Sequence, residues 1–167
     1  LAEAGGFDPR ILAPHVRSFS VGQHRLETVA VAGGIRFVND SKATNPDAML
    51  RALDVVAGND GRPNVLLIAG GVDKGVDFAG LEERLGRHVK GVFLIGSCRE
   101  RLAKLWNNVV SCREYVSLDA AVDAATEEAA PGDVVLLSPG CASQDMFGDY
   151  AERGQRFRDL VKRRVGA

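Results

Sequence analysis

This sequence lacks the patterns that mark several common protein classes. It has three cysteines in 167 residues and no CxxC pair, so neither a zinc knuckle nor a disulfide framework is indicated. No apolar run approaches the ~20 residues that span a bilayer. Neither charge sign dominates, because 21 basic residues stand against 22 acidic ones. We therefore expect no nucleic-acid partner, no membrane partner and a reduced, cytoplasmic setting.

Familiar phosphate and metal motifs are also missing. No GxGxxG follows an expected strand, and GxxxxGK[ST] does not occur. The segment Gly70–Lys74 is not a P-loop, because its spacing is wrong and a glycine follows the lysine. No HExxH or paired-histidine spacing supports a metal site built by the chain itself. If the chain takes part in nucleotide chemistry, the phosphate loop must come from outside it.

The length suits one domain with a fragment of another. Residues 1–22 carry two short apolar patches broken by prolines, and the chain starts with neither Met nor a signal peptide. We expect residues 1–22 to be the tail of a preceding domain with a linker. Residues 23–167 are expected to form the domain itself, within a longer chain.

A hairpin is expected at the start of this domain. Residues 24–31 alternate between apolar and polar side chains with period two, as a half-buried strand does. The pair Gly33-Gly34 is a turn signal, and residues 35–38 return as a second strand. Asn45 and Pro46 suit the cap and first position of the helix that follows, and Gly58 suits its stop.

Helix and strand patterns then alternate to the end of the chain. Apolar runs favour buried parallel strands, with a weaker signal at one site; the expected strands are 64–69, 92–95, 115–116 (the weak one) and 133–139. Amphipathic spacing indicates the helices, which are expected from residue 46 and over 81–87, 99–105, 118–129 and 150–165. This order predicts a Rossmann-like α/β fold, namely a doubly wound, mostly parallel six-stranded sheet with an N-terminal antiparallel hairpin.

Polar or glycine-rich loops follow three of the expected strands: Asp40–Thr44, Gly70–Lys74 and Ser138–Ser143. The carboxyl ends of parallel strands meet at one edge of a sheet, where ligands bind in open α/β folds. Two lysines and several hydroxyls would then face one crevice. This combination suits an anionic ligand, either a carboxylate or a phosphate.

Each loop also has a simpler interpretation. Asp40–Asn45 could be only a turn that caps a helix, and Gly70-Gly71 only a tight turn. Ser143 could cap the next helix, and Cys141 could be a small buried side chain. The chemistry therefore depends on all three loops meeting.

Five segments together resemble the C-terminal domain of the Mur ligases. The segments are His24–Glu27, Asn39–Asn45, Gly70–Phe78, Leu137–Ser143 and Tyr150–Gly154. The blocks Asp-Ser-Lys-Ala-Thr-Asn and Ser-Pro-x-Cys-Ala-Ser are similar to those of the branch that adds D-glutamate. Residues 1–22 resemble the end of the family's central, ATP-binding domain.

The resemblance implies an ATP-dependent amide ligase of cytoplasmic peptidoglycan precursor synthesis. ATP would phosphorylate the carboxylate of UDP-N-acetylmuramoyl-L-alanine, and the amine of D-glutamate would attack the acyl phosphate. The central domain of the family supplies the P-loop and most magnesium ligands. The chain is therefore expected to be inactive alone and to act with the N-terminal and central domains of the same polypeptide.

The resemblance also implies roles near the nucleotide and the reacting centre. His24 corresponds to a residue near magnesium and the reacting phosphate, whether or not it contacts the metal directly. Arg25 corresponds to a residue that contacts the nucleotide phosphates, and Asp40 to one that holds the ribose. Lys42 lies where a catalytic lysine contacts the reacting region.

A second group of residues is implied to bind D-glutamate. Thr44, Lys74 and Ser143 match residues that hold its carboxylates, and Lys42 also faces the incoming amino acid. Tyr150 falls where the family often has phenylalanine, whose backbone helps to hold the glutamate.

Two alternatives stay open. The chain could come from another Mur-type or folylpolyglutamate-type ligase, although the Ser-Pro-Gly-Cys-Ala-Ser stretch and the lack of an Asp-Asn-Pro-Arg motif weigh against this. It could also be a stand-alone, non-catalytic α/β module that binds an anion, and the missing P-loop is the support for that interpretation.

Overall fold

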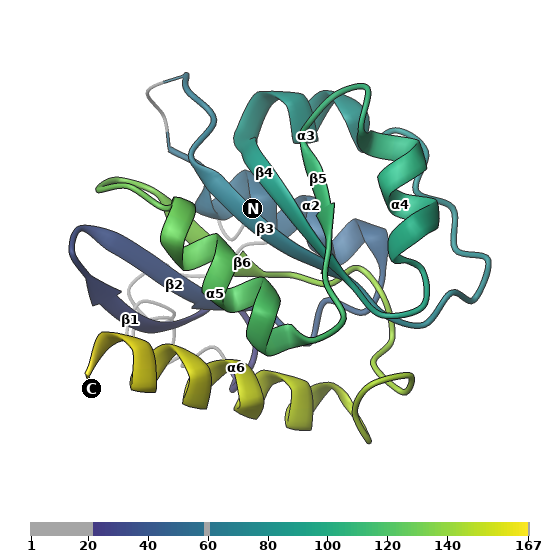
Figure 1. Ribbon diagram of the computed structural model, residues 1–167. Coiled ribbons are helices and arrows are strands. Elements are labelled where there is room, and N and C mark those ends of the chain that lie inside the picture. The colour runs from purple at the N-terminus through teal and green to yellow at the C-terminus, as the bar shows by residue number, and fades with distance from the viewer. Residues whose placement is uncertain (1–21, 59–60, 167) are drawn as a thin grey trace, which may run out of the picture.

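The computed structural model describes residues 22–58 and 61–166, and the expected tail lies outside this range apart from Gly22. Within the described ranges, six strands form one sheet in the order β1-β2-β6-β3-β4-β5, with helices on both faces (Figure 1). None of the helices in these ranges is long and apolar enough to cross a membrane.

The sheet begins with an antiparallel hairpin, as expected. β1 (Glu27–Ala32) pairs with β2 (Ile35–Asn39) through a register shift between Thr28 and Ala30. The expectation that the first strand starts at His24 was wrong. His24 and Leu26 have φ of 63° and 43°, so the chain turns through left-handed backbone before β1 begins.

The remaining strands run parallel to β2, which confirms the fold class. They are β3 (Val65–Gly70), β4 (Val89–Ile95), β5 (Cys112–Glu114) and β6 (Val134–Leu137). The edge strand β5 lies before the expected residues 115–116. Tyr115 instead stacks on Phe93 with ring centroids 5.9 Å apart, and Val116 is 86% exposed.

Helices cover the two faces of the sheet separately. α2 (Pro46–Val56), α3 (Glu82–His88) and α4 (Arg99–Trp106) enclose one apolar core. α5 (Leu118–Glu128) and α6 (Tyr150–Val165) enclose the other. Alternate residues of the central strands enter the two cores, so β3 and β4 are buried on both sides, as apolar parallel strands should be.

The start of α2 was predicted correctly, and the helix ends just before the expected Gly58. The Asn45 side chain accepts a hydrogen bond from the Ala48 N–H at 2.9 Å, and Pro46 is the first helical residue. The cap residue itself is Ala57, whose backbone is extended rather than left-handed. The Gly58 N–H then donates to Asn64 Oδ1 at 3.0 Å, so a distant asparagine fixes this end.

Candidate functional site

The three polar loops meet at the carboxyl edge of the sheet, as predicted. We call them the Asp40 loop (residues 40–44), the Gly71 loop (70–75) and the Ser138 loop (138–143). They follow β2, β3 and β6, which are neighbours in the order β2-β6-β3. Backbone hydrogen bonds of 2.9 Å join them: Gly140 N–H to Ala43 O, Gly70 N–H to Pro139 O, and Val72 N–H to Ala142 O.

Gly71 makes the contact between the second and third loops possible. Its φ is +146°, and a Cβ placed there would lie 2.1 Å from the Ala142 carbonyl oxygen. Only a residue without a side chain lets the two backbones approach this closely. The glycine pair at 70 and 71 is therefore more than a tight turn, since it seats the Gly71 loop against the Ser138 loop.

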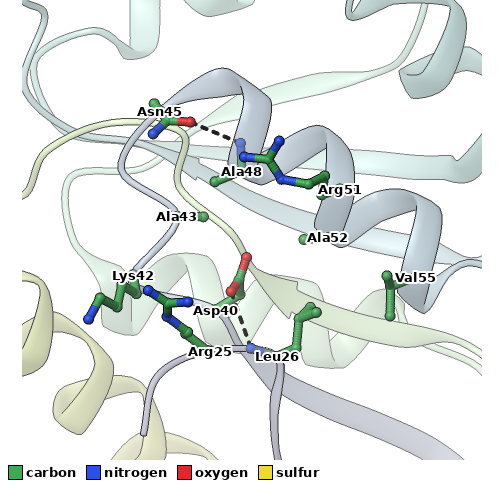
Figure 2. A pocket seen from close by; sticks show the side chains of 10 residues that line it. All are labelled: Arg25, Leu26, Asp40, Lys42, Ala43, Asn45, Ala48, Arg51, Ala52 and Val55. Atoms are coloured by element: carbon green, nitrogen blue, oxygen red, sulfur yellow. Dashed lines mark hydrogen bonds between the residues drawn. The ribbon is translucent and has the colours of Figure 1, made fainter. Parts of the chain in front are cut away.

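A surface hollow of about 520 Å³ opens beside the Asp40 loop. Figure 2 shows Arg25 and Lys42 next to Asp40 on one side, with Arg51 of α2 on the other. The remaining lining is mainly small or apolar, and comprises Leu26, Ala43, Asn45, Ala48, Ala52 and Val55. The hollow thus combines three cationic side chains and one carboxylate with an apolar wall.

Asp40 is fixed on both carboxylate oxygens. Oδ1 accepts from the Leu26 N–H at 3.2 Å, and Oδ2 accepts from Ser138 Oγ at 2.8 Å. Burial raises the pKa of this carboxyl, while the Ser138 and Leu26 hydrogen bonds and the nearby charge of Arg25 act to lower it. The carboxylate is thus held rigidly at the wall of the hollow.

Lys42 and Tyr150 lie together at the start of α6. The Lys42 Nζ is 5.2 Å from the centroid of the Tyr150 ring, within range of a cation–π interaction. Ser41, next to Lys42, donates from Oγ to the Tyr150 carbonyl at 2.7 Å. The Asp40 loop is therefore hydrogen-bonded to the start of α6. As a result Lys42 and Tyr150, two of the predicted glutamate-binding residues, lie side by side.

Ser143 has a buried hydroxyl without a partner. The residue is 2% exposed, and its Oγ makes no hydrogen bond to any residue that the structure describes. Its carbonyl accepts from the N–H groups of Met146 and Phe147. Ser143 does not cap α6, because Asp149 does so by accepting from the Glu152 N–H at 2.8 Å. An unpaired buried hydroxyl is costly, so it is a strong candidate to bind a ligand.

Lys74 is exposed in the Gly71 loop, and the preceding residue, Asp73, fixes the shape of that loop. Asp73 accepts two hydrogen bonds from Arg101, at 2.7 and 2.9 Å, and one from the Gly75 N–H at 2.9 Å. The Gly75 N–H and the Arg101 guanidinium lower the pKa of Asp73. Thr44 lies half-buried at the end of the Asp40 loop. Neither Lys74 nor Thr44 lines the hollow that holds Arg25 and Asp40.

His24 lies inside the domain against α6. It is 6% exposed, its Nδ1 is 2.9 Å from the Asn39 amide nitrogen, and the same amide donates to the Gly154 carbonyl at 3.1 Å. Among residues 22–58 and 61–166, no group of three or more His, Cys, Asp and Glu side chains could hold a metal ion. The described residues therefore do not fit a magnesium site by themselves.

Two cationic side chains were missed by the sequence reasoning. Arg51 lines the hollow opposite Asp40, and Arg153 is fully buried beneath the Asp40 and Ser138 loops. The signal for Arg153 was its position on α6. It shares the apolar face with Phe157, Leu160 and Val161, where an arginine needs a special reason.

Comparisons with known proteins find relatives of this chain. The family described as Mur ligase, glutamate ligase domain, matches residues 24–141. A protein from Acidobacterium capsulatum named UDP-N-acetylmuramoylalanine--D-glutamate ligase is 42% identical over 166 residues, 99% of this chain and 35% of the relative. A protein of the same name from Aquifex aeolicus is 37% identical, over 94% of this chain and 37% of the relative. The chain thus spans about a third of the length of these relatives.

Solved structures share the fold. Escherichia coli FolC in complex with DHPP and ADP superposes with a TM-score of 0.64 at 20% identity, over 95% of this chain and 36% of that one. The murein peptide ligase Mpl from Psychrobacter arcticus gives a TM-score of 0.58 at 14% identity, over 89% and 32%. With the family match over residues 24–141, these observations show that the chain belongs to the Mur ligase family, whose glutamate ligase domain it contains.

Proposed function

We propose that this chain is the C-terminal domain of an ATP-dependent amide ligase that joins D-glutamate to UDP-N-acetylmuramoyl-L-alanine. The observation that carries the proposal is that three polar loops are joined by hydrogen bonds at one edge of the sheet, where one of them carries the unpaired hydroxyl of Ser143. The names of relatives about 40% identical support the choice of D-glutamate. The reaction belongs to peptidoglycan precursor synthesis in the cytoplasm.

D-glutamate brings two carboxylates, and four side chains at this edge suit them. Lys42 and Lys74 provide point charges on exposed, flexible stems. Ser143 offers a hydroxyl donor that no described residue uses, and Thr44 offers a second hydroxyl at the end of the Asp40 loop. Hydrogen bonds to an ionised carboxylate are stronger than those between neutral groups, so few donors are needed. Tyr150 adds the backbone at the start of α6.

The nucleotide lies in the hollow beside the Asp40 loop under this proposal. The rigid carboxylate of Asp40 accepts hydrogen bonds from ribose hydroxyls, and Arg25 contacts the phosphates. The γ-phosphoryl group of ATP is transferred to the carboxylate of the UDP-linked substrate, which gives an acyl phosphate and ADP. The amine of D-glutamate attacks the acyl carbon, loses a proton, and expels phosphate as the amide forms.

Lys42 is the residue of this chain that serves the chemical step. Its ammonium group stands between the hollow that it lines and the Tyr150 ring, so it can face both the phosphoryl group and the incoming amino acid. A fixed cation stabilises the negative charge that develops on the acyl phosphate. His24 would act from its buried position through neighbouring groups. Closure of this domain over the other domains excludes water, which would hydrolyse the intermediate.

The remaining parts of the site come from elsewhere in the full polypeptide. The N-terminal and central domains supply the phosphate loop and the magnesium ligands, since the described residues hold neither. Residues 1–22 are the end of the central domain in this proposal. The likeness to folylpolyglutamate synthases is at 20% identity or below, so it extends to the fold alone and does not favour a folate substrate.

The test is a ligase assay on the full-length enzyme that contains this chain. ADP release and product formation are measured with UDP-N-acetylmuramoyl-L-alanine and, in turn, D-glutamate, L-glutamate, L-lysine and meso-diaminopimelate. We expect turnover with D-glutamate and with none of the other three amino acids. Turnover with a diamino acid or with L-glutamate, and none with D-glutamate, would overturn the proposal.

A further inference from the structure

Arg153 is a buried cation that hydrogen-bonds to two of the loops, the Asp40 loop and the Ser138 loop. It lies on α6 and is 1% exposed. Its Nε donates to Ser41 Oγ at 3.0 Å, and Nη2 donates to the Ser41 carbonyl at 2.9 Å. Both Nη1 and Nη2 donate to the Cys141 carbonyl, at 3.2 and 3.1 Å. One guanidinium group therefore spans the Asp40 loop and the Ser138 loop.

No carboxylate among the described residues hydrogen-bonds to Arg153, although the charge of Asp145 acts on the guanidinium group from a longer distance. Every hydrogen bond of its guanidinium ends on a neutral oxygen of Ser41 or Cys141. Burial lowers its pKa to about 10, so the group stays cationic at neutral pH. Buried charges are normally paired, because removal from water is costly. An anion bound above the loops would add to the partial compensation that Asp145 provides.

The two loops that Arg153 contacts each carry a residue that we propose binds D-glutamate. Ser41 precedes Lys42, and Cys141 comes two residues before Ser143. Ser41 also donates to the Tyr150 carbonyl, which ties the start of α6 to the same unit. A shift of the guanidinium group would therefore move Lys42 and Ser143 relative to each other.

We propose that Arg153 is the positioning residue of the D-glutamate site: it sets the separation of Lys42 and Ser143, and its buried charge draws the dicarboxylate to the loops. This inference rests on the proposed function. Arg153 does not line the hollow that holds Arg25 and Asp40, so its effect should fall on the amino acid rather than on the nucleotide.

The experiment compares three variants of the full-length ligase. Arg153→Met removes the charge, and Arg153→Lys keeps the charge but replaces the planar, five-donor guanidinium group with a compact ammonium group. Arg156→Met is the matched control, because Arg156 lies on the exposed face of the same helix and pairs with Asp119. The KM values for D-glutamate, ATP and UDP-N-acetylmuramoyl-L-alanine are measured for each, with kcat.

We expect Arg153→Met to raise the KM for D-glutamate about tenfold or more, as loss of charge-assisted hydrogen bonds does. The KM for ATP should change less than about twofold, the range of a variant that leaves a site intact. Arg153→Lys should fall between Arg153→Met and the wild type, and Arg156→Met should match the wild type. A folded Arg153→Met with an unchanged KM for D-glutamate would overturn the inference, as would equal losses for ATP and D-glutamate.

A second measurement separates positioning from general loss of structure. Arg153→Ala leaves a cavity that fits a guanidinium ion, so low concentrations of guanidinium chloride should lower its KM for D-glutamate, whereas sodium chloride should not. If the alanine and methionine variants fail to fold, Arg153→Lys decides, since equal KM increases for ATP and D-glutamate would contradict a positioning role. A wild-type enzyme that rejects D-glutamate would refute the proposed function itself, a result distinct from any of these.

Discussion

Two buried serines at the loop edge have opposite surroundings. Ser138 donates from Oγ to the Asp40 carboxylate at 2.8 Å, and both residues are buried. Ser143 is equally buried, but its hydroxyl has no partner within the described residues. The first hydroxyl contributes to the stability of the domain, and the second makes no hydrogen bond that could do so.

This contrast can be measured by urea unfolding of the chain. Ser138→Ala should lower the free energy of unfolding by about 1–3 kcal/mol, because a buried carboxylate loses a donor. Ser143→Ala should leave that free energy unchanged or slightly raised, because no hydrogen bond is lost. A loss at Ser143 as large as that at Ser138 would show that the Ser143 hydroxyl has a partner inside the fold.

The three cysteines should react slowly as thiols. Cys98 and Cys141 are buried with their sulfur atoms 3.4 Å apart, and burial raises the pKa of half-buried Cys112 to about 11. At pH 8 roughly a thousandth of Cys112 is thiolate, and its labelling rate should rise about tenfold per pH unit. A disulfide reagent should therefore modify Cys112 first and slowly. Rapid labelling of Cys141 in the native protein at pH 7 would contradict the described burial.

At the scale of elements, the contact between the Gly71 and Ser138 loops depends on one glycine. Gly71→Ala should destabilise the chain by more than about 2 kcal/mol, since the new methyl group would collide with the Ala142 carbonyl. Gly80 is the control, because it also has positive φ (+82°) but nothing lies within 4 Å of the position that a Cβ would take there. Gly80→Ala should cost about 1 kcal/mol. If urea unfolding showed the same loss of free energy for Gly71→Ala and Gly80→Ala, the close approach of the two loop backbones would not be the reason for glycine at position 71.

Elements with strong local signals were predictable from the sequence. The apolar runs of β3, β4 and β6 and the Asn45-Pro46 start of α2 are encoded by neighbouring residues. The errors arose where distant contacts decide. The edge strand β5 is three residues long and lies before the expected residues 115–116, because Tyr115 packs on Phe93.

The site was also predictable only in part, namely where its position follows from the local strand patterns. Parallel topology brings the three loops to one edge, and the residues of each loop follow from its strand. The burial of His24 and Ser143 depends on how α6 and its preceding loop fold back, which no local pattern encodes. The role of Arg153 was hidden because three of its four hydrogen bonds go to backbone carbonyls, which any residue type can contribute.

At the scale of the whole molecule, the proposed function gives this chain only one side of a nucleotide site. The open hollow holds Arg25 and Asp40, and the sequence has no glycine-rich phosphate loop of the GxxxxGK[ST] type. The isolated chain should therefore bind ATP with a dissociation constant of about 1 mM or weaker. Calorimetry is the measurement, and micromolar binding by the chain alone would contradict the division of the site between domains.

The central claim is that the three loops form the D-glutamate site. The most direct measurement is steady-state kinetics of Lys74→Ala and Ser143→Ala in the full-length enzyme, with D-glutamate and ATP varied separately. We expect the KM for D-glutamate to rise about tenfold or more in each variant while the KM for ATP stays within about twofold. Equal effects on both substrates would contradict the claim.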